Sequence, residues 1–221
     1  MPPDVFRSDD PALLAPLDGK TVAILGYGNQ GRAHALNLRD SGTTVIIGTA
    51  PDRRGAARAR EDGYETLHLA EAAARCDLAI IGLPDESHAT VLPEDVFPFL
   101  RPSATIGFLH GFSLHYGHVT PPASVGVILV APKGPGTTLR ERFLRGEGIP
   151  ALIAVHRDNR DSNAMDLVRA WGAGIGCAYA GLLETTFAEE TETDLFGEQA
   201  VLCGGATELV VAGFETLVEA G

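Results

Sequence analysis

Three carboxylates follow one another at four-residue intervals near the C-terminal end of the chain, at Glu190, Asp194 and Glu198. On a helix this spacing puts all three on one stripe, where like charges repel. One interpretation is therefore a solvated acidic face. The apolar residues at 195–196 and 200–202 favour instead a largely buried helix, in which carboxylates need a cation. Carboxylate oxygens suit Mg²⁺, so the second interpretation is a metal site with Asp194 and Glu198 as its ligands.

Two side chains that follow predicted strands, those of Lys133 and His110, are candidates for a site beside the predicted pyrophosphate. Lys133 is one of only two lysines among 17 basic residues, and it lies in the turn Ala-Pro-Lys-Gly-Pro-Gly, where a compact ammonium can do what a planar guanidinium cannot. His110 ends the preceding strand. A single histidine is often only structural, but these two residues are expected to converge on one crevice at the sheet edge.

A glycine-rich turn indicates a nucleotide site. The sequence Gly26-Tyr27-Gly28-Asn29-Gln30-Gly31 fits G-x-G-x-x-G between a predicted strand and a predicted helix. In this motif the first glycine makes the turn, the second lets a pyrophosphate approach the backbone, and the third allows close helix packing. The helix N-terminus then faces the anion, so the motif predicts a bound dinucleotide.

The next βα loop bears on the choice of nicotinamide cofactor. A carboxylate here accepts the ribose 2′-hydroxyl of NAD(H), whereas arginine accommodates the 2′-phosphate of NADP(H). The loop offers both, as Asp52 beside Arg53 and Arg54, and the two cations favour NADPH. Solvated first-turn residues are the simpler alternative. The segment Asp85, Glu86, Ser87 and His88 follows another predicted strand, where Asp85 could equally cap a helix.

Apolar runs alternate with helical patterns over most of the chain, which predicts a parallel sheet in an α/β fold. The predicted strands are residues 21–25, 44–47, 78–83, 104–109, 125–131 and 151–156, and the predicted helices are 29–40, 52–62, 139–145 and 161–171. Beyond about Thr186 only helical patterning remains. Residues 187–221 are too few for an independent domain and are expected to pack against another part of the protein.

Composition narrows the class of protein. The 221 residues carry a net charge of −12, which argues against binding to nucleic acid or to an anionic membrane. No uninterrupted apolar run reaches membrane-spanning length, and the first residues lack the pattern of a signal peptide. The three cysteines are expected to be reduced. The sequence therefore predicts a cytoplasmic protein.

Four motifs together resemble the ketol-acid reductoisomerase family. They are the segment 26–42, His-Gly-Phe at 110–112, Ala-Pro-Lys-Gly-Pro-Gly at 131–136, and Glu-Thr-Glu-Thr-Asp-Leu-Phe-Gly-Glu-Gln at 190–199. The resemblance implies a Rossmann-type, doubly wound, mainly parallel sheet in residues 1–186 and the start of a helical, metal-binding domain in 187–221. It also implies NADPH, two Mg²⁺ ions, a homo-oligomer, and a 2-acetolactate-type ketol acid as the substrate of branched-chain amino-acid biosynthesis.

The resemblance also assigns roles to single residues. His110 and Lys133 match catalytic residues, Asp194 and Glu198 match metal ligands, and Glu190 matches their partner. Matches to nucleotide-contacting residues are Tyr27 to Gln30, Arg53, Asp85 to His88, and Gly136. The glycine motif and the loop after the second strand add Gly26, Gly31 and Asp52 as candidates.

Two features depart from the family pattern. Arg53 and Gly55 replace phosphate-binding serines, and the family's later glutamates and substrate-binding serine have no counterpart before Gly221. The chain is thus expected to be short at its C-terminal end. The alternative to an isomeroreductase is a relative without isomerisation, acting as a nicotinamide-dependent 2-keto-acid reductase or as a non-catalytic nucleotide-binding module.

Overall fold

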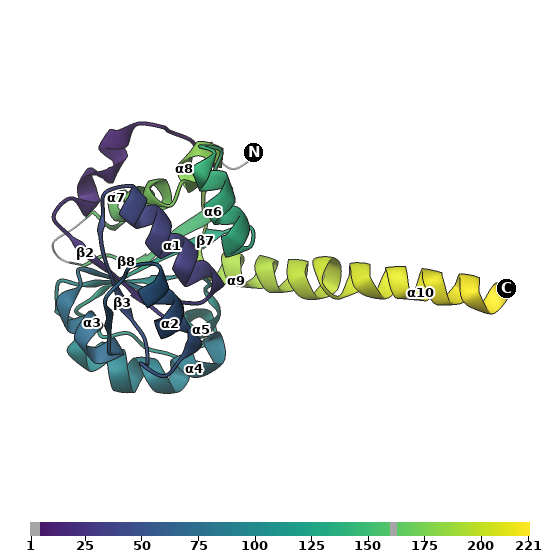
Figure 1. The fold of residues 1–221 in the computed structure, drawn as a ribbon, viewed down its shortest axis with the longest axis horizontal. Coiled ribbons are helices and arrows are strands. Elements are labelled where there is room, and N and C mark those ends of the chain that lie inside the picture. The colour runs from purple at the N-terminus through teal and green to yellow at the C-terminus, as the bar shows by residue number, and fades with distance from the viewer. Residues whose placement is uncertain (1–4, 160–162) are drawn as a thin grey trace.

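The computed structural model describes residues 5–159 and 163–221, and these form one mixed sheet flanked by helices, with a long helix projecting from it (Figure 1). Within the described residues the sheet has nine strands in the order β1-β9-β8-β7-β6-β5-β2-β3-β4. Their bounds are β1 Val5–Phe6, β2 Thr21–Leu25, β3 Thr44–Gly48, β4 Thr66–Leu67, β5 Leu78–Ile81, β6 Thr105–Phe108, β7 Gly126–Pro132, β8 Ala151–Arg157 and β9 Leu182–Glu184.

The six strands from β7 to β4 are all parallel, whereas β8 runs antiparallel to β7 and β1 antiparallel to β9. The chain passes outward from β2 through β3 to β4 in one direction, and from β5 through β6 to β7 in the other. The order therefore reverses between β2 and β5. In open α/β sheets, ligands bind at such a reversal, beyond the carboxyl ends of the strands.

The central strands are apolar on both faces because each face is covered. In β2, Val22 and Ile24 join one buried cluster while Ala23 and Leu25 join the other. The same alternation holds along β5 and β7, as the two-residue period of a strand requires. A continuous apolar run suits a strand here, because the pleat places successive side chains in the two buried clusters on opposite faces of the sheet.

Helices cover both faces. Those contributing to the cluster with Val22 are η1 Pro11–Leu17, α1 Asn29–Asp40, α2 Arg54–Glu61, α6 Gly136–Leu144, α7 Ala164–Gly174 and α8 Cys177–Ala180. The opposite face carries α3 Leu69–Arg75, η2 Leu92–Val96 and η3 Phe97–Phe99, with α4 Asp85–Val91 and α5 Phe112–His115 at the carboxyl edge.

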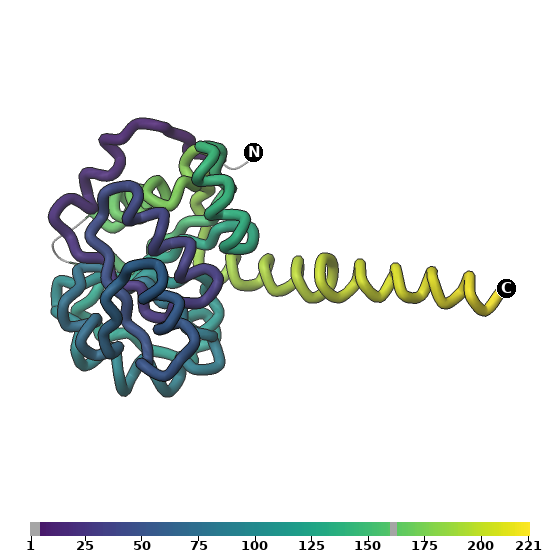
Figure 2. The backbone as a smooth tube through the Cα atoms, in the orientation of Figure 1, coloured from purple at the N-terminus to yellow at the C-terminus, as the bar shows by residue number. Residues whose placement is uncertain are grey.

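The chain ends in a helical rod of three elements, α9 Phe187–Phe196, the π turn η4 Gly197–Leu202, and α10 Gly205–Ala220. The first two turns of α9 are anchored, through buried Phe187, Glu190 and Thr191, and the chain beyond them extends away from the sheet (Figure 2). The expectation that this segment is largely buried is wrong here: Phe196 and Leu202 are 68% and 70% exposed. Their apolar side chains find no partner among the described residues.

The predicted fold class is confirmed, with differences at particular elements. The helix predicted over 52–62 begins only at Arg54, and the one predicted over 161–171 spans Ala164–Gly174, with residues 161–162 outside the described residues. Strands β1, β4 and β9 were not predicted. As predicted, all three cysteines are unpaired.

Candidate active site

The candidate residues gather at the carboxyl edge of the sheet. His110 follows β6, Lys133 follows β7, and Asp85 opens α4 after β5. These three strands are parallel neighbours, so their ends lie side by side. The turn from Gly26 follows β2, the next strand in the same row. The sheet thus positions four segments that are far apart in the sequence.

The glycine turn has the form its motif requires. Gly26 has φ of +100°, and a Cβ there would lie 2.6 Å from the carbonyl oxygen of Gly82. At Gly31 a Cβ would lie 2.2 Å from the oxygen of Gly26, whereas at Gly28 it would meet nothing within 4 Å. Gly26 and Gly31 are therefore needed by the protein's own packing, and the space beside Gly28 is left for a ligand.

Two helix N-termini meet beside this turn. A Cβ on Gly136, the first residue of α6, would lie 2.3 Å from the backbone oxygen of Asn29, the first residue of α1. Gln30 donates from Nε2 to the oxygen of Gly134 at 2.9 Å. Neither helix has a side-chain cap, unlike α9, where Thr186 accepts from the backbone N–H of Glu189. The free N–H groups fit the pyrophosphate of a dinucleotide.

Tyr27 is held by partners that the sequence analysis did not identify. Its hydroxyl donates to Asp62 at 3.0 Å, and Asp62 also accepts from Nε and Nη2 of Arg32 at 2.7 and 2.9 Å. Burial and the hydrogen bond to Asp62 raise the pKa of Tyr27 far above its usual range. Asp62 follows the last residue of α2, and nothing in its local sequence indicated this contact.

The loop after β3, where the sequence analysis placed the choice of cofactor, is exposed. Arg53 is the residue before α2 and Arg54 its first residue, and both lie with Asp52 on the surface beyond β3. Among the described residues none of the three has an ion pair or hydrogen-bonding side-chain partner. Their charges therefore remain available to a ribose or a phosphate.

His88, in contrast, is buried and engaged at both ring nitrogens. Nε2 lies 3.0 Å from the backbone oxygen of Leu83, and Nδ1 lies 2.9 Å from the hydroxyl of Ser113. Burial lowers the pKa of His88, so the neutral ring donates from Nε2 and accepts at Nδ1. This side chain joins α4 to α5. Asp85, Glu86 and Ser87 are the more accessible part of the segment.

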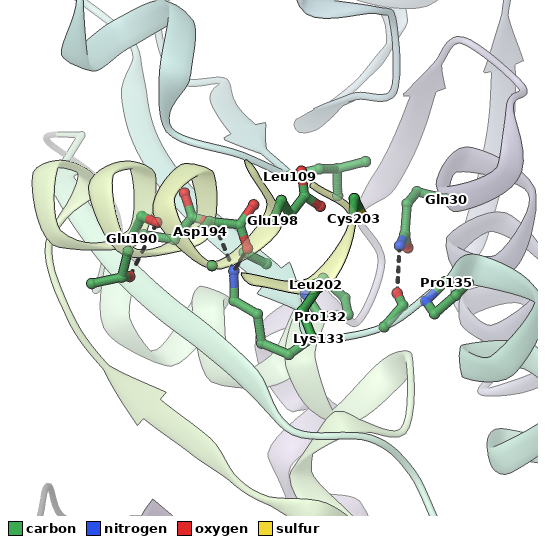
Figure 3. A pocket seen from close by; sticks show the side chains of 14 residues that line it. Gln30, Leu109, Pro132, Lys133, Pro135, Glu190, Asp194, Glu198, Leu202 and Cys203 are labelled. Carbon is green, nitrogen blue, oxygen red and sulfur yellow. Dashed lines mark hydrogen bonds and ion pairs between the residues drawn. The ribbon is translucent and has the colours of Figure 1, made fainter. Parts of the chain in front are cut away.

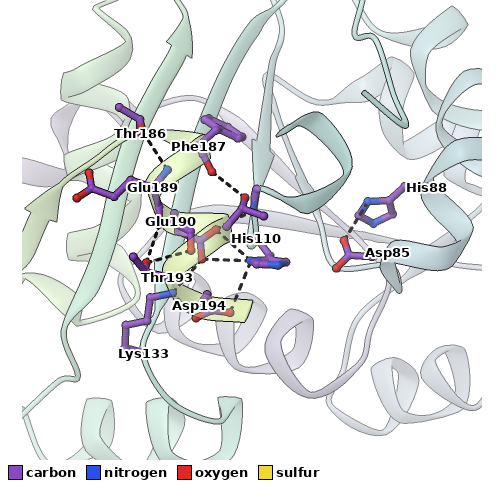
Figure 4. A network of polar contacts seen from close by, with 12 residues as sticks. Asp85, His88, His110, Lys133, Thr186, Phe187, Glu189, Glu190, Thr193 and Asp194 are labelled. Atoms are coloured by element: carbon purple, nitrogen blue, oxygen red, sulfur yellow. Dashed lines mark hydrogen bonds and ion pairs between the residues drawn. The ribbon is translucent and has the colours of Figure 1, made fainter. Parts of the chain in front are cut away.

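Glu190 is the centre of the polar network (Figure 4). Its side chain is 1% exposed, yet its carboxylate contacts three donors. Nδ1 of His110 lies 3.0 Å from Oε2, the N–H of Gly111 donates to the same oxygen at 2.9 Å, and Nζ of Lys133 donates to Oε1 at 2.9 Å. A buried carboxylate is stable only when it is paired and hydrogen-bonded in this way.

The charged groups of this network shift one another's pKa toward the ionised forms. Burial lowers the pKa of His110, but its hydrogen bond to Glu190 and the charges of Glu190 and Asp194 outweigh this effect and raise it. Burial likewise lowers the pKa of Lys133, and its hydrogen bonds to Asp194 and Glu190 raise it overall. For Glu190, burial raises the pKa, and the bonds to His110 and Lys133 bring it below its usual value. The carboxylates thus favour the protonated forms of His110 and Lys133, and these two side chains favour the ionised form of Glu190.

Asp194 and Glu198 line a cleft of about 670 Å³ (Figure 3). Nζ of Lys133 donates to Oδ1 of Asp194 at 2.6 Å, while Oδ2 lies 3.7 Å from Nδ1 of His110. The carboxylate of Glu198 has no hydrogen bond or ion pair with the described residues. The cleft also borders Gln30, Leu109 and Cys203, so it adjoins the nucleotide turn.

This donor set fits a hard divalent cation. Ligand atoms of His110, Glu190 and Asp194 lie within 4.8 Å of one another. The carboxylate oxygens of Glu190 are already used by protein donors, so Asp194 and Glu198 have the oxygens that a metal could take. Mg²⁺ is commonly held by only one or two carboxylates, with water and substrate oxygens completing its shell.

Comparison with known families finds two matches that cover most of the chain. Residues 16–181 match the model for the NADPH-binding domain of acetohydroxy acid isomeroreductase, and residues 187–221 match the model for the C-terminal domain of ketol-acid reductoisomerase. The second match begins at Phe187, the first residue of α9.

Solved structures agree with these matches. An NADH-preferring ketol-acid reductoisomerase from an uncultured archaeon is 41% identical, with a TM-score of 0.91 over 99% of this chain and 67% of that chain. A semialdehyde dehydrogenase NAD-binding protein from Cupriavidus necator, in complex with calcium and NAD, is 19% identical with a TM-score of 0.73, over 91% of this chain and 75% of that chain. The second likeness concerns the fold alone.

Proposed function

Because the chain belongs to the ketol-acid reductoisomerase family, we propose that it converts 2-acetolactate-type ketol acids into 2,3-dihydroxy acids by alkyl migration followed by reduction. Such a reaction belongs to the biosynthesis of valine and isoleucine. The observation that carries the proposal is the meeting of His110, Lys133 and the α9 carboxylates in one cleft beside the nucleotide turn.

Asp194 and Glu198 would hold Mg²⁺, which supplies Lewis-acid polarisation of the substrate oxygens when bound. Glu190 fixes the two cationic side chains. Lys133 has three N–H donors, of which two contact Glu190 and Asp194, so one remains for a substrate oxygen. His110 uses Nδ1 for Glu190, which leaves Nε2 to exchange a proton with the substrate.

The cofactor is a nicotinamide dinucleotide, which supplies the reducing equivalent when it is bound at the Gly26–Gly31 turn. For the choice between its two forms we propose NADPH, because Arg53 and Arg54 provide two exposed cations against the single carboxylate of Asp52. A charge-assisted contact to the 2′-phosphate is worth roughly 1.5–3 kcal/mol, or about 10- to 160-fold in affinity. The archaeal relative is described as preferring NADH, so the preference must be measured.

The dissociation constants of NADPH and NADH decide this point. We expect tighter NADPH binding in the unmodified protein and a loss of that advantage in Arg53→Ala. Equal constants, or tighter NADH, would mean that Asp52 determines the preference.

An assay of two substrates side by side tests the reaction. With Mg²⁺ and NADPH, 2-acetolactate and 3-hydroxy-3-methyl-2-oxobutanoate should both be consumed. Consumption of the second substrate only would indicate a 2-keto-acid reductase without isomerisation. No turnover of either, with NADPH still bound, would indicate a nucleotide-binding module.

Thermal unfolding tests the metal ligands separately from activity. Mg²⁺ with a keto acid should raise the melting temperature by mass action. Asp194→Asn should abolish this increase and leave NADPH binding nearly unchanged, whereas Glu192→Gln, an exposed carboxylate on the same helix, should retain it. The same increase in the Asp194→Asn protein would mean that α9 carries only a solvated acidic face.

The cellular setting is part of the proposal. By length and composition, Phe187–Ala220 could cross a membrane, with a mean hydropathy of 1.5, but a single such helix is weak evidence. Its acidic residues, including Glu208, Glu215 and Glu219, would be costly in lipid. We therefore propose a cytoplasmic homo-oligomer that binds neither nucleic acid nor membranes.

A further inference from the structure

Lys133 occupies the place where a divalent cation is needed. Its ammonium donates to Asp194 at 2.6 Å and to Glu190 at 2.9 Å, so it bridges the two carboxylates of α9 that face the cleft. The side chain is 31% exposed, and that of Asp194 is 24% exposed. The contact lies at the mouth of the cleft, within reach of ligands from solution.

A metal ion and this ammonium cannot both keep their best positions at Asp194. Mg²⁺ requires oxygen ligands at about 2.0–2.1 Å. A dication on Asp194 would then stand only a few ångströms from Nζ, where two like charges repel strongly outside bulk water. Lys133 must therefore move away from Asp194, or the metal must bind with less help from that carboxylate.

We infer that Lys133 is a built-in competitor of the divalent cation, and that an anionic keto acid relieves the competition by taking the ammonium as its own partner. This inference rests on the proposed metal-dependent function. Its consequence is cooperativity: the keto acid strengthens metal binding, and by linkage the metal strengthens keto-acid binding to the same extent.

Glu190 makes this exchange possible. Because Glu190 also contacts His110 and the backbone N–H of Gly111, it stays paired when Lys133 turns toward a ligand. Among the described residues the carboxylate of Asp194 has no such backbone donor, and its Oδ2 lies 3.7 Å from Nδ1 of His110. Lys133 can thus leave Asp194 while remaining held by Glu190.

The first test is calorimetric titration of Mg²⁺ into the whole protein without nicotinamide, in the absence and presence of 3-hydroxy-3-methyl-2-oxobutanoate. For the unmodified protein, the keto acid should tighten Mg²⁺ binding. For Lys133→Met, which keeps the length of the side chain and removes its charge, binding of Mg²⁺ alone should tighten by about tenfold. The further gain from the keto acid should largely disappear.

Two variants control for general charge effects. Lys133→Arg keeps a cation at the same place and should leave Mg²⁺ binding weak. Lys20→Met removes the chain's other lysine, which precedes β2 at the edge of the sheet opposite the cleft, and should behave like the unmodified protein. Unchanged or weaker Mg²⁺ binding in a folded Lys133→Met protein, judged by its NADPH affinity, would overturn the inference.

A second measurement needs no substitution in the cleft. In Lys20→Met protein labelled with [ε-¹³C]lysine, the one remaining lysine signal belongs to Lys133. The inference predicts that this signal shifts in step with Mg²⁺ saturation. If Mg²⁺ saturates the protein while the signal stays in place, Lys133 does not compete for the site.

The outcomes also separate this inference from the proposed function. Absence of Mg²⁺ binding under every condition, in all variants, would contradict the metal-dependent function itself. Mg²⁺ binding that depends on Asp194 but not on Lys133 would leave that function standing and contradict only the competition.

Discussion

A fully buried carboxylate such as Glu190 is stable only because donors surround it. His110, Gly111 and Lys133 together satisfy both of its oxygens, and the contacts with Glu190 raise the pKa of His110 and of Lys133. The cost of removing such a group from water is offset only while these contacts last. Glu190 therefore holds His110 and Lys133 in position and favours the protonated form of each.

Glu190→Gln should lower the free energy of unfolding by about 3 kcal/mol, because it leaves two partly buried cations short of a counter-charge. The pKa of His110 should also fall, since Glu190 is what raises it. Urea denaturation and a histidine NMR titration measure the two effects. Glu192→Gln, on an exposed side chain of the same helix, should cost less than about 1 kcal/mol. A pKa of His110 unchanged by Glu190→Gln would mean that other groups control this histidine.

A substitution at Gly28 tests ligand binding without disturbing the packing of the fold. A Cβ at Gly28 meets nothing within 4 Å, so Gly28→Val should fold with a nearly unchanged melting temperature. It should nevertheless weaken NADPH binding by about tenfold or more, equivalent to about 1.4 kcal/mol, by blocking the pyrophosphate. Gly31→Val, whose Cβ would lie 2.2 Å from Gly26, should instead destabilise the protein. Full NADPH affinity in Gly28→Val would place the cofactor elsewhere.

Between elements, a polar pair in the core joins α1 to α7. Nε1 of Trp171 donates to Nδ1 of His34 at 3.0 Å, and both side chains are fully buried. The other ring nitrogen of His34 has no hydrogen-bond partner among the described residues. Burial lowers the pKa of His34 to about 3. His34 is therefore neutral in the folded protein, and protonation of its ring favours unfolding.

The free energy of unfolding should consequently fall as the solution is acidified. The unfolded histidine takes up a proton below about pH 6.5, while the folded one does so only near pH 3. Within this window His34 alone removes up to about 1.4 kcal/mol per pH unit. Urea denaturation between pH 7 and pH 5 measures the slope, which should be smaller in His34→Gln and unchanged in His68→Gln, an exposed control. Equal slopes in all three proteins would contradict the assignment.

Strands and helices could be predicted from the sequence where their pattern of apolar residues matches the face that is buried against the sheet. The strand Thr21–Leu25 and helix α1 Asn29–Asp40 have the bounds that the sequence predicted, because both are apolar where the sheet covers them. Strands β1 and β4 have two residues each, too few to show a period. The π turn of η4 was also missed, since a period of 3.6 residues was assumed throughout.

The site was predictable in part. The strand pattern placed His110 and Lys133 at one edge of the sheet, and the family resemblance alone added Glu190. The contacts show that the three side chains lie together. The N–H of Gly111 and the carboxylate of Asp62 were not anticipated, because backbone donors and partners brought in by tertiary packing leave no mark on local sequence. The prediction that the C-terminal helix is buried was wrong. Its apolar residues indicate that the helix needs a partner, but they do not show whether the described residues supply that partner.

At the scale of the molecule, an α/β body carries a rod whose apolar side chains face solvent. On α10, Val210, Phe214 and Leu217 share one face, and Phe214 and Leu217 are 67% and 75% exposed. Glu208, Glu215 and Glu219 lie at other positions of the same helix. Such a face calls for a protein partner, and a second copy of the chain is the simplest one.

The protein is therefore expected to self-associate through α10. Sedimentation velocity over a range of concentrations should show a dimer or a larger species. Phe214→Glu should shift the equilibrium toward monomer, and Glu215→Gln, the adjacent acidic residue, should not. A monomer at all concentrations would mean that α10 is covered by something other than a second copy.

The π turn fixes the direction in which this apolar face points. In η4 the N–H of Cys203 bonds to the oxygen of Glu198, five residues back, so the turn holds one residue more than an α-helical turn. An α-helix rotates by about 100° per residue. Loss of one codon from this turn would leave Glu190 and Asp194 in place and swing the apolar face of α10 by more than a quarter of a revolution. The angle around the helix axis between the carboxylates of α9 and the apolar face of α10 is therefore set by the number of residues between them.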